Sequence, residues 1–206
     1  MELINYKKQV TPVCYEGYIE REVLNMPLPK ENYGCTVDDI YALPEGERAE
    51  LLDGKIYDMA PPTSTHQFML GDLHYSIRGF ILNHKGSCQV AMAPFAVFLN
   101  DDDRNYVEPD LSVICNPSKI DEKGCHGAPD WIIEIVSPSS ERMDYVVKQF
   151  KYRTAGVREY WVIDKPLQKV TVFDFENDKM FEYDFTQKIP VAIYNGELEI
   201  DLSRFA

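Results

Sequence analysis

The spacing of hydrophobic residues predicts that strands and helices alternate along this chain. Between Thr63 and Asn83 apolar side chains return every three or four residues, which is the spacing of one face of a helix. A second helix is predicted from about Ser139 to Thr154, with the serines of SPSS as its cap and Gly156 just past its end. Short apolar runs rich in β-branched and aromatic residues predict strands at 88–99, 110–115, 131–136, 158–164, 169–175 and 181–185.

The N-terminal part of the chain divides into an irregular segment followed by two short elements. TVDDIYALP, at 36–44, predicts a short helix that starts after a threonine cap and ends before a proline. AELLDGKIYDM, at 49–59, predicts a hairpin that turns at its Asp-Gly pair. We expect an extension at 1–35, laid over the core or a partner subunit, and one domain at 36–206. That domain is an α/β fold whose mixed central β-sheet is flanked by helices.

The composition is that of a chain able to bury a core, because 45% of its 206 residues are hydrophobic and 12% are aromatic. It has no run of about eighteen apolar residues, and its N-terminus lacks the apolar stretch of a signal peptide. The five cysteines are scattered, odd in number and never spaced as CxxC pairs, which is typical of reduced thiols. We therefore expect a soluble cytoplasmic protein without a membrane segment.

The formal net charge of -13 argues against a protein that coats nucleic acid, because it repels the phosphate backbone. The segment 141–170 is different, since it holds seven basic and four acidic residues. The basic residues are Arg142, Lys148, Lys151, Arg153, Arg158, Lys165 and Lys169. If any surface meets a polyanion, we expect it to be formed by this segment.

One carboxylate, that of Glu134, falls inside the apolar run WIIEIV. An ionised carboxylate there is costly unless a cation, a hydrogen-bond network or a metal ion receives it, and the same holds for Asp110 at the start of the preceding strand. Carboxylates from two adjacent strands can converge on Mg²⁺, which can activate water for attack on a phosphodiester. Lys148 is the candidate cation for the phosphate, because the spacing places Asp144, Lys148 and Tyr152 on one helix face.

The same residues also have purely structural interpretations. Glu134 can be a buried partner of Lys148 or of an arginine, Asp110 can cap a turn, and Lys148 can be an exposed helix cation. The residues by themselves leave these alternatives open.

Five stretches and a histidine resemble a known family. They are ELLDG, His66, PDLSVI, PDWIIEIVSPSS, DYVVKQFKY and GVREYWVID. From about Thr36 to Phe175 the chain resembles the Uma-type putative restriction-endonuclease family, formerly a bacterial domain of unknown function, within the PD-(D/E)xK nuclease-like superfamily. The resemblance implies a restriction-endonuclease-like fold for the domain at 36–206.

The resemblance also implies roles for individual residues. Asp110 and Glu134 would be the metal-binding acids of a nuclease site that uses Mg²⁺ or Mn²⁺. Glu50 matches a further position of the family and would supply a third acid to the metal. His66 would orient water or bind phosphate.

The chain departs from the superfamily pattern at the lysine of (D/E)xK, because Val136 stands at that place. We expect Lys148, on the following helix, to take over this catalytic role. Asp144 and Tyr152, on the same helix face, are expected to line the site.

The first hypothesis is therefore a metal-dependent endonuclease that hydrolyses phosphodiester bonds in DNA. It requires the basic segment 141–170 to face the cleft that holds the acids. One alternative is a catalytically silent nuclease-fold protein with a binding or regulatory role, favoured by the net charge and the missing strand lysine. Another is a metal enzyme that acts on a small phosphorylated substrate, which needs no long basic track. We expect a homodimer, because strand edges and the N-terminal extension invite pairing.

Overall fold

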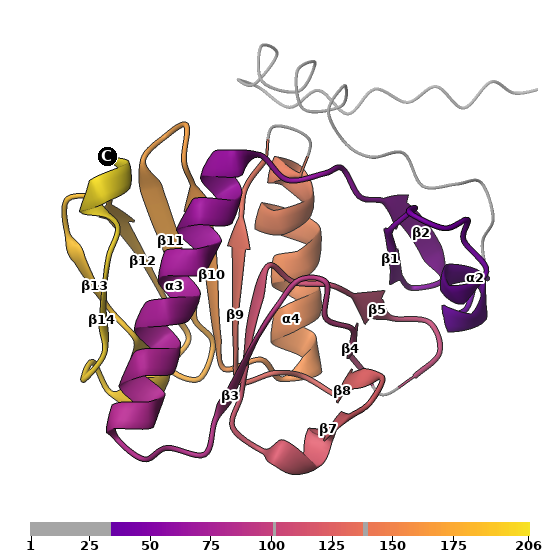
Figure 1. Ribbon diagram of the computed structural model, residues 1–206, viewed down its shortest axis with the longest axis horizontal. Helices are drawn as coiled ribbons and strands as arrows, with labels where there is room; N and C mark the ends of the chain where they lie inside the picture. The colour runs from indigo at the N-terminus through magenta and orange to yellow at the C-terminus, as the bar shows by residue number, and fades with distance from the viewer. Residues whose placement is uncertain (1–33, 101, 138–139) are drawn as a thin grey trace, which may run out of the picture.

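The computed structural model describes residues 34–100, 102–137 and 140–206 and has a layered α/β arrangement (Figure 1). Apart from its last two residues, the predicted extension at 1–35 lies outside these ranges. The helical elements are α2 (Val37–Tyr41), α3 (Ser64–Asn83), the π-helix η2 (Met143–Lys148), α4 (Gln149–Ala155) and the short 3-10 helices η1 (Pro117–Lys119), η3 (Ala192–Tyr194) and η4 (Ser203–Phe205). The strands are β1 (Ala49–Leu52), β2 (Lys55–Asp58), β3 (Gln89–Met92), β4 (Val97–Phe98), β5 (Tyr106–Val107), β6 (Leu111–Ile114), β7 (Ile120–Asp121), β8 (Gly124–His126), β9 (Trp131–Ile135), β10 (Glu159–Asp164), β11 (Lys169–Asp174), β12 (Lys179–Asp184), β13 (Lys188–Pro190) and β14 (Glu199–Asp201).

The central sheet has the strand order β12-β11-β10-β9-β6-β3. Its middle strands β9 and β10 are parallel and its other neighbours are antiparallel, so the sheet is mixed, as predicted. A parallel pair needs a crossover connection, which η2 and α4 supply between β9 and β10.

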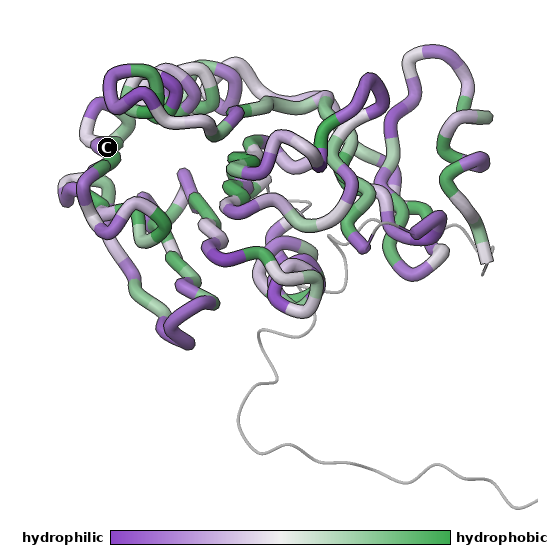
Figure 2. The backbone as a smooth tube through the Cα atoms, turned by 90° about the horizontal axis from the view of Figure 1, so that it is seen from below, coloured by the Kyte–Doolittle hydropathy of each residue, from purple (hydrophilic) through white to green (hydrophobic). Residues whose placement is uncertain are grey.

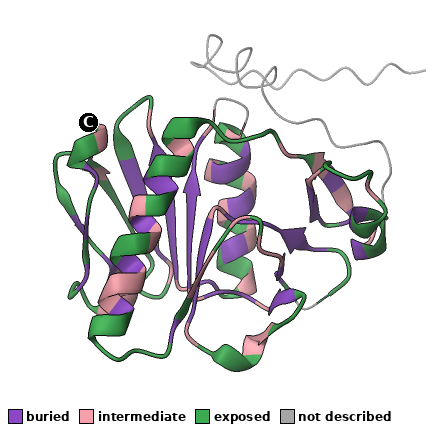
Figure 3. Cartoon of the chain, viewed as in Figure 1, coloured by how far each residue is buried: buried purple, intermediate pink, exposed green. Residues whose placement is uncertain are grey.

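Two helices cover opposite faces of this sheet, as Figure 2 shows from below. Successive side chains of a strand point to opposite faces. Trp131, Ile133 and Ile135 of β9 accordingly pack with the apolar side of α3. Ile132 packs on the other face, with the core next to α4, and Glu134 points to that same face. The strands between the helices are buried throughout most of their length (Figure 3).

A second sheet of shorter strands has the order β2-β1-β5-β4-β8-β7. The predicted hairpin is confirmed as β1 and β2, and Asp53 and Gly54 adopt the positive φ values, 51° and 73°, that its tight turn requires. Leu51 of β1 pairs with Tyr106 of β5. This pairing brings Glu50 next to the segment that leads from β5 into β6.

The strand predicted at 88–99 is wrong as a single element. β3 pairs with β6 in the central sheet, whereas β4 pairs with β5 and β8 in the second sheet. The cis peptide between Ala93 and Pro94 lies between the two strands. Proline has no N–H to donate to a strand ladder, and the ladder of β3 with β6 ends at Met92, just before this position. The other predicted strands are present as β6, β9, β10, β11 and β12, and the hairpin of β13 with β14 was not predicted.

The helix predicted after β9 is present but begins differently. Residues 138–139 of its predicted cap lie outside the described ranges, and the segment from Met143 to Lys148 is π-helical rather than α-helical. α4 then continues to Ala155 and ends at Gly156, whose φ of 97° is the predicted left-handed stop. None of the helices in the described ranges combines the length and the apolar character needed to cross a bilayer.

The expectation of reduced thiols throughout the chain is wrong for one pair, because Cys88 and Cys115 form a disulfide. The two residues occupy the next facing positions beyond the ladder of β3 with β6. Cys35 and Cys125 are buried and are not disulfide-bonded, while Cys14 lies outside the described ranges. The cysteine argument for a reducing compartment therefore no longer holds, and the cytoplasmic location stays a prediction.

Candidate active site

Asp110, which directly precedes β6, lies beside Glu134 of the neighbouring strand β9. In the antiparallel ladder of β6 with β9, Leu111 pairs with Ile133, so Asp110 lies beside Glu134. The backbone N–H of Asp110 donates to Glu134 Oε2 over 3.3 Å, and the N–H of Ile135 donates to Asp110 Oδ2 over 2.8 Å. The backbones of the two strands thus hold both carboxylates at one place on the sheet.

The ammonium of Lys148 lies between two carboxylates that come from different sheets. Its Nζ is 3.0 Å from Glu134 Oε1 and 2.8 Å from Glu50 Oε2. Asp144 Oδ1, one turn earlier on the helix, lies 3.6 Å from the same nitrogen. Tyr152, one turn later, donates its hydroxyl to Glu134 Oε1 over 2.7 Å. The helix face predicted from the spacing of these residues therefore meets the sheet at Glu134.

These side chains are almost closed off from solvent. The exposed fraction is 5% for Glu50, 4% for Glu134, 2% for Asp144, 5% for Lys148 and 0% for Tyr152. Buried charges are tolerated when they are paired and hydrogen-bonded, which is how these charges are arranged. The alternative of Lys148 as an exposed helix cation is therefore wrong.

His66 orients Asp110 from the start of α3. The side chain of Thr63 caps this helix and accepts the backbone N–H of His66 over 3.2 Å. Nε2 of His66 lies 3.0 Å from Asp110 Oδ2. Nδ1 is buried without a hydrogen-bond partner in the part of the chain that the structure describes. Asp110 Oδ2 therefore contacts both the imidazole of His66 and the backbone N–H of Ile135. These two contacts fix the orientation of the carboxylate.

Negative charge exceeds positive charge in this cluster. Around the Lys148 ammonium lie the carboxylates of Glu50, Glu134 and Asp144, and Asp110 lies beside Glu134. Burial, together with the neighbouring carboxylates, raises the pKa of Glu134 to about 8 even though Lys148 opposes the shift. Burial also raises the pKa of Asp144 to about 6 against the same ammonium. Burial lowers the pKa of Lys148, but the surrounding carboxylates outweigh it and hold that pKa well above its usual value. Near neutral pH the cluster therefore retains a proton unless a further cation balances it.

A cavity of ≈ 510 Å³ opens over the cluster. Glu50, Asp110, Glu134, Asp144 and Lys148 all line it. Its walls come from the start of α3, the residues that follow β9, and the end of β10. In Figure 1 the start of α3 and the carboxyl end of β9 lie together at the top of the central sheet. The cavity thus connects the buried acids with the surface.

The donor atoms of the site suit a hard divalent cation. Mg²⁺ takes oxygen ligands, usually one or two carboxylates with water and substrate phosphate completing the shell. Glu134 Oε2 has only the long contact with the N–H of Asp110, and Asp110 Oδ1 accepts no hydrogen bond from the residues described. Within the described ranges no three acidic, histidine or cysteine side chains are already arranged as a set of metal ligands. The residues present therefore fit a metal held by two carboxylates, with the other ligands supplied from outside the protein.

Arg48, Glu108 and Lys165 also line the cavity, and the sequence analysis did not choose them as site residues, although Lys165 belongs to the basic segment 141–170. Arg48 Nε donates to Glu108 Oε2 over 2.9 Å, and the backbone N–H of Glu108 donates to Glu50 Oε1 over 3.1 Å. Arg48 is two residues before Glu50. Alternate residues of an extended strand point to the same face, so the side chains of Arg48 and Glu50 are expected on one face. Lys165 directly follows β10, whose carboxyl end lies beside that of the parallel strand β9. These two signals could have found both cations.

Most of the basic segment 141–170 points away from the cavity. Only Lys148 and Lys165 of its seven basic residues, all of them in the described ranges, line it. The ion pairs that its other residues form with acids outside the cavity are Lys151 with Asp53, Arg153 with Asp178, Arg158 with Asp130 and Glu176, and Lys169 with Glu182. The requirement that this segment face the acids is therefore met only in part.

The structure brings together all the residues that the sequence analysis chose for the site. They are Glu50, His66, Asp110, Glu134, Asp144, Lys148 and Tyr152. Their roles as ligands or catalysts stay predictions.

A mixed sheet with an acid from each of two neighbouring strands, and a lysine between acids, belongs to the restriction-endonuclease-like class. The crystal structure of a putative nuclease belonging to DUF820 from Anabaena variabilis ATCC 29413 has this fold in common with the protein. The match has a TM-score of 0.66 and 23% sequence identity, and it covers 82% of this chain and 96% of that chain.

The model of the Uma2 family, described as putative restriction endonuclease, matches residues 37–202. The chain therefore belongs to the Uma2 family, and its family and fold support a nuclease. Among curated proteins no sequence gives a significant match.

Proposed function

We propose that this protein is a Mg²⁺- or Mn²⁺-dependent endonuclease that hydrolyses phosphodiester bonds in DNA. The observation that carries the proposal is the excess of buried carboxylates over cations beneath an open cavity. Three carboxylates surround the ammonium of Lys148, and a fourth, that of Asp110, lies beside Glu134. Burial, together with the neighbouring carboxylates, raises the pKa of Glu134 to about 8. A divalent cation is the ligand that this charge balance favours. Membership of a family described as putative restriction endonuclease supports the same activity.

Asp110 and Glu134 would hold the metal through the oxygens that face the cavity, Asp110 Oδ1 and Glu134 Oε2. His66 and the backbone N–H of Ile135 keep Asp110 in position from the other side. Glu50 binds Lys148 as the structure stands, and its role as a third acid on the metal stays a prediction. A bound Mg²⁺ or Mn²⁺ would supply an activated water and neutralise charge on the phosphate.

Lys148 would act in place of the lysine that the superfamily carries at the position of Val136. Its Nζ approaches the same carboxylate, that of Glu134, from the following helix at 3.0 Å. Burial opposes the charged amine, but Glu134, Glu50 and Asp144 outweigh it and hold the pKa of Lys148 well above the usual value. The ammonium lies on the cavity, where it would stabilise negative charge on a phosphate oxygen.

The test is cleavage of plasmid and single-stranded DNA with Mg²⁺, with Mn²⁺ and with EDTA. Wild type is compared with Asp110→Asn and Glu134→Gln, which keep the shape of each side chain but remove its charge. Asp178→Asn is the matched control, because Asp178 is an exposed acid paired with Arg153 away from the cavity. We expect metal-dependent cutting by wild type and the control, and a loss of at least about a hundredfold in both site variants. Cutting that persists in Glu134→Gln, or in EDTA, would refute the proposal.

A second candidate is a nuclease-fold protein that binds a phosphorylated ligand without cutting it. The observation that favours it is the small number of lysines and arginines on the cavity, which are Arg48, Lys148 and Lys165 among the described residues. The same variants separate the two candidates. Metal-dependent binding of an oligonucleotide or a nucleotide, without hydrolysis after prolonged incubation, would favour this candidate over the endonuclease.

A further inference from the structure

One face of the hairpin formed by β1 and β2 lines the cavity. Glu50 pairs with Tyr57 in the ladder, so their side chains lie on the same side of the hairpin. The N–H of Met59 donates to the carbonyl of Arg48 over 2.9 Å, which continues the same register. Because alternate residues of a strand share a face, Arg48 and Met59 lie on the side of Glu50 and Tyr57. All four residues line the cavity.

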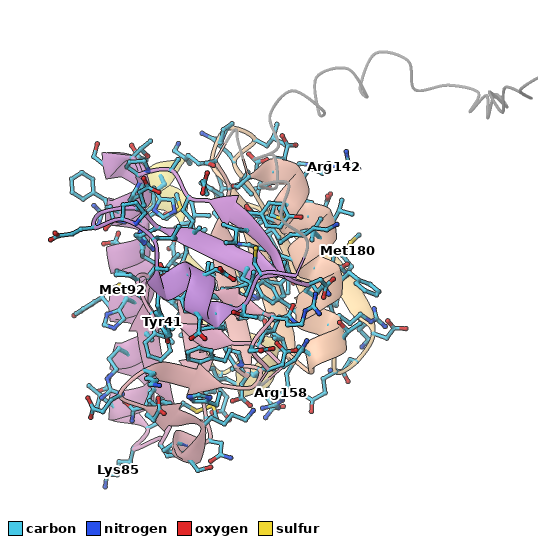
Figure 4. The ribbon with its side chains drawn as sticks, turned by 90° about the vertical axis from the view of Figure 1, so that its right-hand side faces the viewer. Tyr41, Lys85, Met92, Arg142, Arg158 and Met180 are labelled. Atoms are coloured by element: carbon cyan, nitrogen blue, oxygen red, sulfur yellow. A yellow bond between two sulfur atoms is a disulfide. The ribbon has the colours of Figure 1, made fainter. Side chains whose placement is uncertain are left out.

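The other face of the hairpin packs in a separate core. Ala49, Leu51 and Ile56 are 1%, 0% and 5% exposed and form one cluster with apolar residues of α2. Figure 4 shows the molecule from the side of α2, whose Tyr41 is labelled. The hairpin is thus anchored by the face that points away from the cavity.

The side chains next to Glu50 on the cavity face are suited to stacking on a nucleobase. Tyr57 supplies an aromatic ring and Met59 a polarizable thioether, and both residues are half-buried. Unpaired bases bind proteins by stacking on aromatic rings and on the planes of guanidinium groups. Tyr57 also packs against the core next to α4, which restrains its side chain.

The guanidinium of Arg48 is held in place by Glu108. Nε donates to Glu108 Oε2 over 2.9 Å, and Nη2 contacts the same oxygen. Glu108 Oε1 accepts the hydroxyl of Tyr106 over 2.7 Å. Within the described ranges Nη1 of Arg48 donates no hydrogen bond, and the side chain is 34% exposed. Arg48 therefore brings a fixed, planar positive charge to the cavity, which suits a backbone phosphate or the face of a base.

This face of the hairpin adjoins the acids of the candidate site. Glu50 lies 2.8 Å from the ammonium of Lys148, which contacts Glu134 on its other side. The cavity volume of ≈ 510 Å³ falls within the range of about 300–1,000 Å³ that is usual for small-molecule sites. A nucleotide whose phosphate lies at the acids therefore has its base beside the hairpin.

We propose that Arg48, Tyr57 and Met59 form a base platform, which binds an unpaired nucleobase next to the phosphate at Asp110 and Glu134. The inference rests on the proposed nuclease function and narrows its substrate to a nucleic acid with an unpaired nucleotide at the cut. In a duplex each base is paired and stacked on its neighbours, so it must leave the stack before it can contact the platform. The platform tolerates different sequences, because every base has a π face.

The first test measures binding without cleavage. Thymidine 5′-monophosphate and 2-deoxyribose 5-phosphate carry the same phosphate, but only the first has a base, and neither contains a phosphodiester bond. Calorimetric titration of the full chain in Mn²⁺ compares their affinities. We expect thymidine monophosphate to bind at least about fivefold more tightly, because of the stacking of its base.

Variants of the platform should affect the base alone. Tyr57→Leu and Met59→Ala are expected to weaken binding of thymidine monophosphate and to leave 2-deoxyribose 5-phosphate unchanged, while Tyr57→Phe keeps the ring and binds as wild type does. The matched controls are Tyr75→Leu and Met180→Ala, since these residues are 80% and 61% exposed and do not line the cavity. Equal affinities of wild type for the two ligands, or an equal loss of both in Tyr57→Leu, would overturn the proposal. Base-dependent binding by a protein that cuts no DNA would support the platform and contradict only the proposed nuclease function.

The second test places a single abasic nucleotide at successive positions of a single-stranded oligonucleotide and measures cleavage. We expect KM to rise at least about fivefold when the abasic nucleotide adjoins the cut. Tyr57→Leu should cause no further rise on that substrate, because the base that its ring would contact is already absent. An abasic nucleotide without effect at any position, or effects of the two changes that add, would contradict the platform.

Discussion

The ammonium of Lys148 lies 3.0 Å from Oε1 of Glu134, and the two residues are only 5% and 4% exposed. They belong to different elements, a π-helix and the strand before it. This contact explains how the carboxylate of Glu134 is tolerated in the middle of an apolar strand. The ammonium and the Tyr152 hydroxyl solvate one oxygen of Glu134, and the other oxygen is directed to Asp110.

Removal of the ammonium by Lys148→Met leaves three buried carboxylates without their cation. Loss of one partner from a buried ion pair costs about 3–5 kcal/mol, so we expect the free energy of unfolding in EDTA to fall by that amount. The measurement is urea denaturation at pH 8. Lys169→Met is the control, since Lys169 is 51% exposed and is paired at the surface with Glu182, and it is expected to change stability by no more than about 0.5 kcal/mol. Equal effects of the two substitutions would show that the buried cluster does not need its cation.

The stability of the metal-free protein should depend on pH through Glu134. Its pKa is raised from 4.5 to about 8 in the folded protein, so between these values the folded state holds a proton that the unfolded state has lost. The contribution to stability is therefore greatest below about pH 4.5 and is lost as the pH rises through 8.

Glu134→Gln removes this titration, because an amide has the shape of the neutral acid and does not ionise. We expect the stability of wild type relative to Glu134→Gln to decline between pH 5 and pH 9, by at most about 1.4 kcal/mol per pH unit. The measurement is chemical denaturation of both proteins across this range in EDTA. A difference that does not change with pH would contradict the raised pKa.

Binding of Mn²⁺ should stabilise wild type and should release a proton near neutral pH, because the metal replaces the proton of Glu134. At a free metal concentration of about 100 times Kd the expected gain is about 2.7 kcal/mol. Thermal unfolding and calorimetric titration in buffers of different ionisation enthalpy measure the two effects. Asp110→Asn should abolish both, while Asp178→Asn retains them, and retention of both effects in Asp110→Asn would remove that residue from the metal.

His66→Ala should weaken metal binding by about tenfold to a hundredfold, because it removes the group that orients Asp110. The substitution should change the free energy of unfolding little, since the side chain is 13% exposed and one ring nitrogen has no partner among the described residues. Mn²⁺ affinity and denaturant midpoint are measured on the same preparation. An unchanged affinity would mean that the strand backbone alone positions Asp110.

Single-stranded DNA should be cut faster than duplex DNA, by at least about tenfold in kcat/KM. The acids lie almost fully buried at the floor of the cavity, and a flexible strand reaches them more easily than the backbone of a stiff duplex. The few cations on the cavity also predict a shallow salt dependence, with a slope of log K against log salt of about -2 or smaller in magnitude. Equal rates on the two substrates, or a steep slope, would indicate a larger surface for DNA than the cavity provides.

Much of the candidate site could be predicted from short-range patterns in the sequence. The apolar run around Glu134, the Pro-Asp step at Asp110 and the spacing of Lys148 from its helical neighbours are all short-range features. They indicated which side chains would meet, because short connections between a strand and the next helix leave few arrangements. The family resemblance, rather than periodicity, identified Glu50 and His66.

Other features depended on contacts between distant segments. The run at 88–99 has the composition of one strand, but its halves join different sheets because each half finds a different partner. The disulfide of Cys88 with Cys115 arises from that same pairing of β3 with β6. Arg48 and Lys165 lie just outside β1 and β10, and their place on the cavity depends on how these strands lie against the rest of the fold.

The sequence by itself determined the order and type of the main elements and the acids and lysine of the candidate site, since hydrophobic period, caps and turn residues act over a few positions. Only the tertiary structure decided that Lys148 is buried among Glu50, Glu134 and Asp144, so that the site carries excess negative charge. Burial and electrostatic balance are properties of many segments packed together, and no local pattern specifies them.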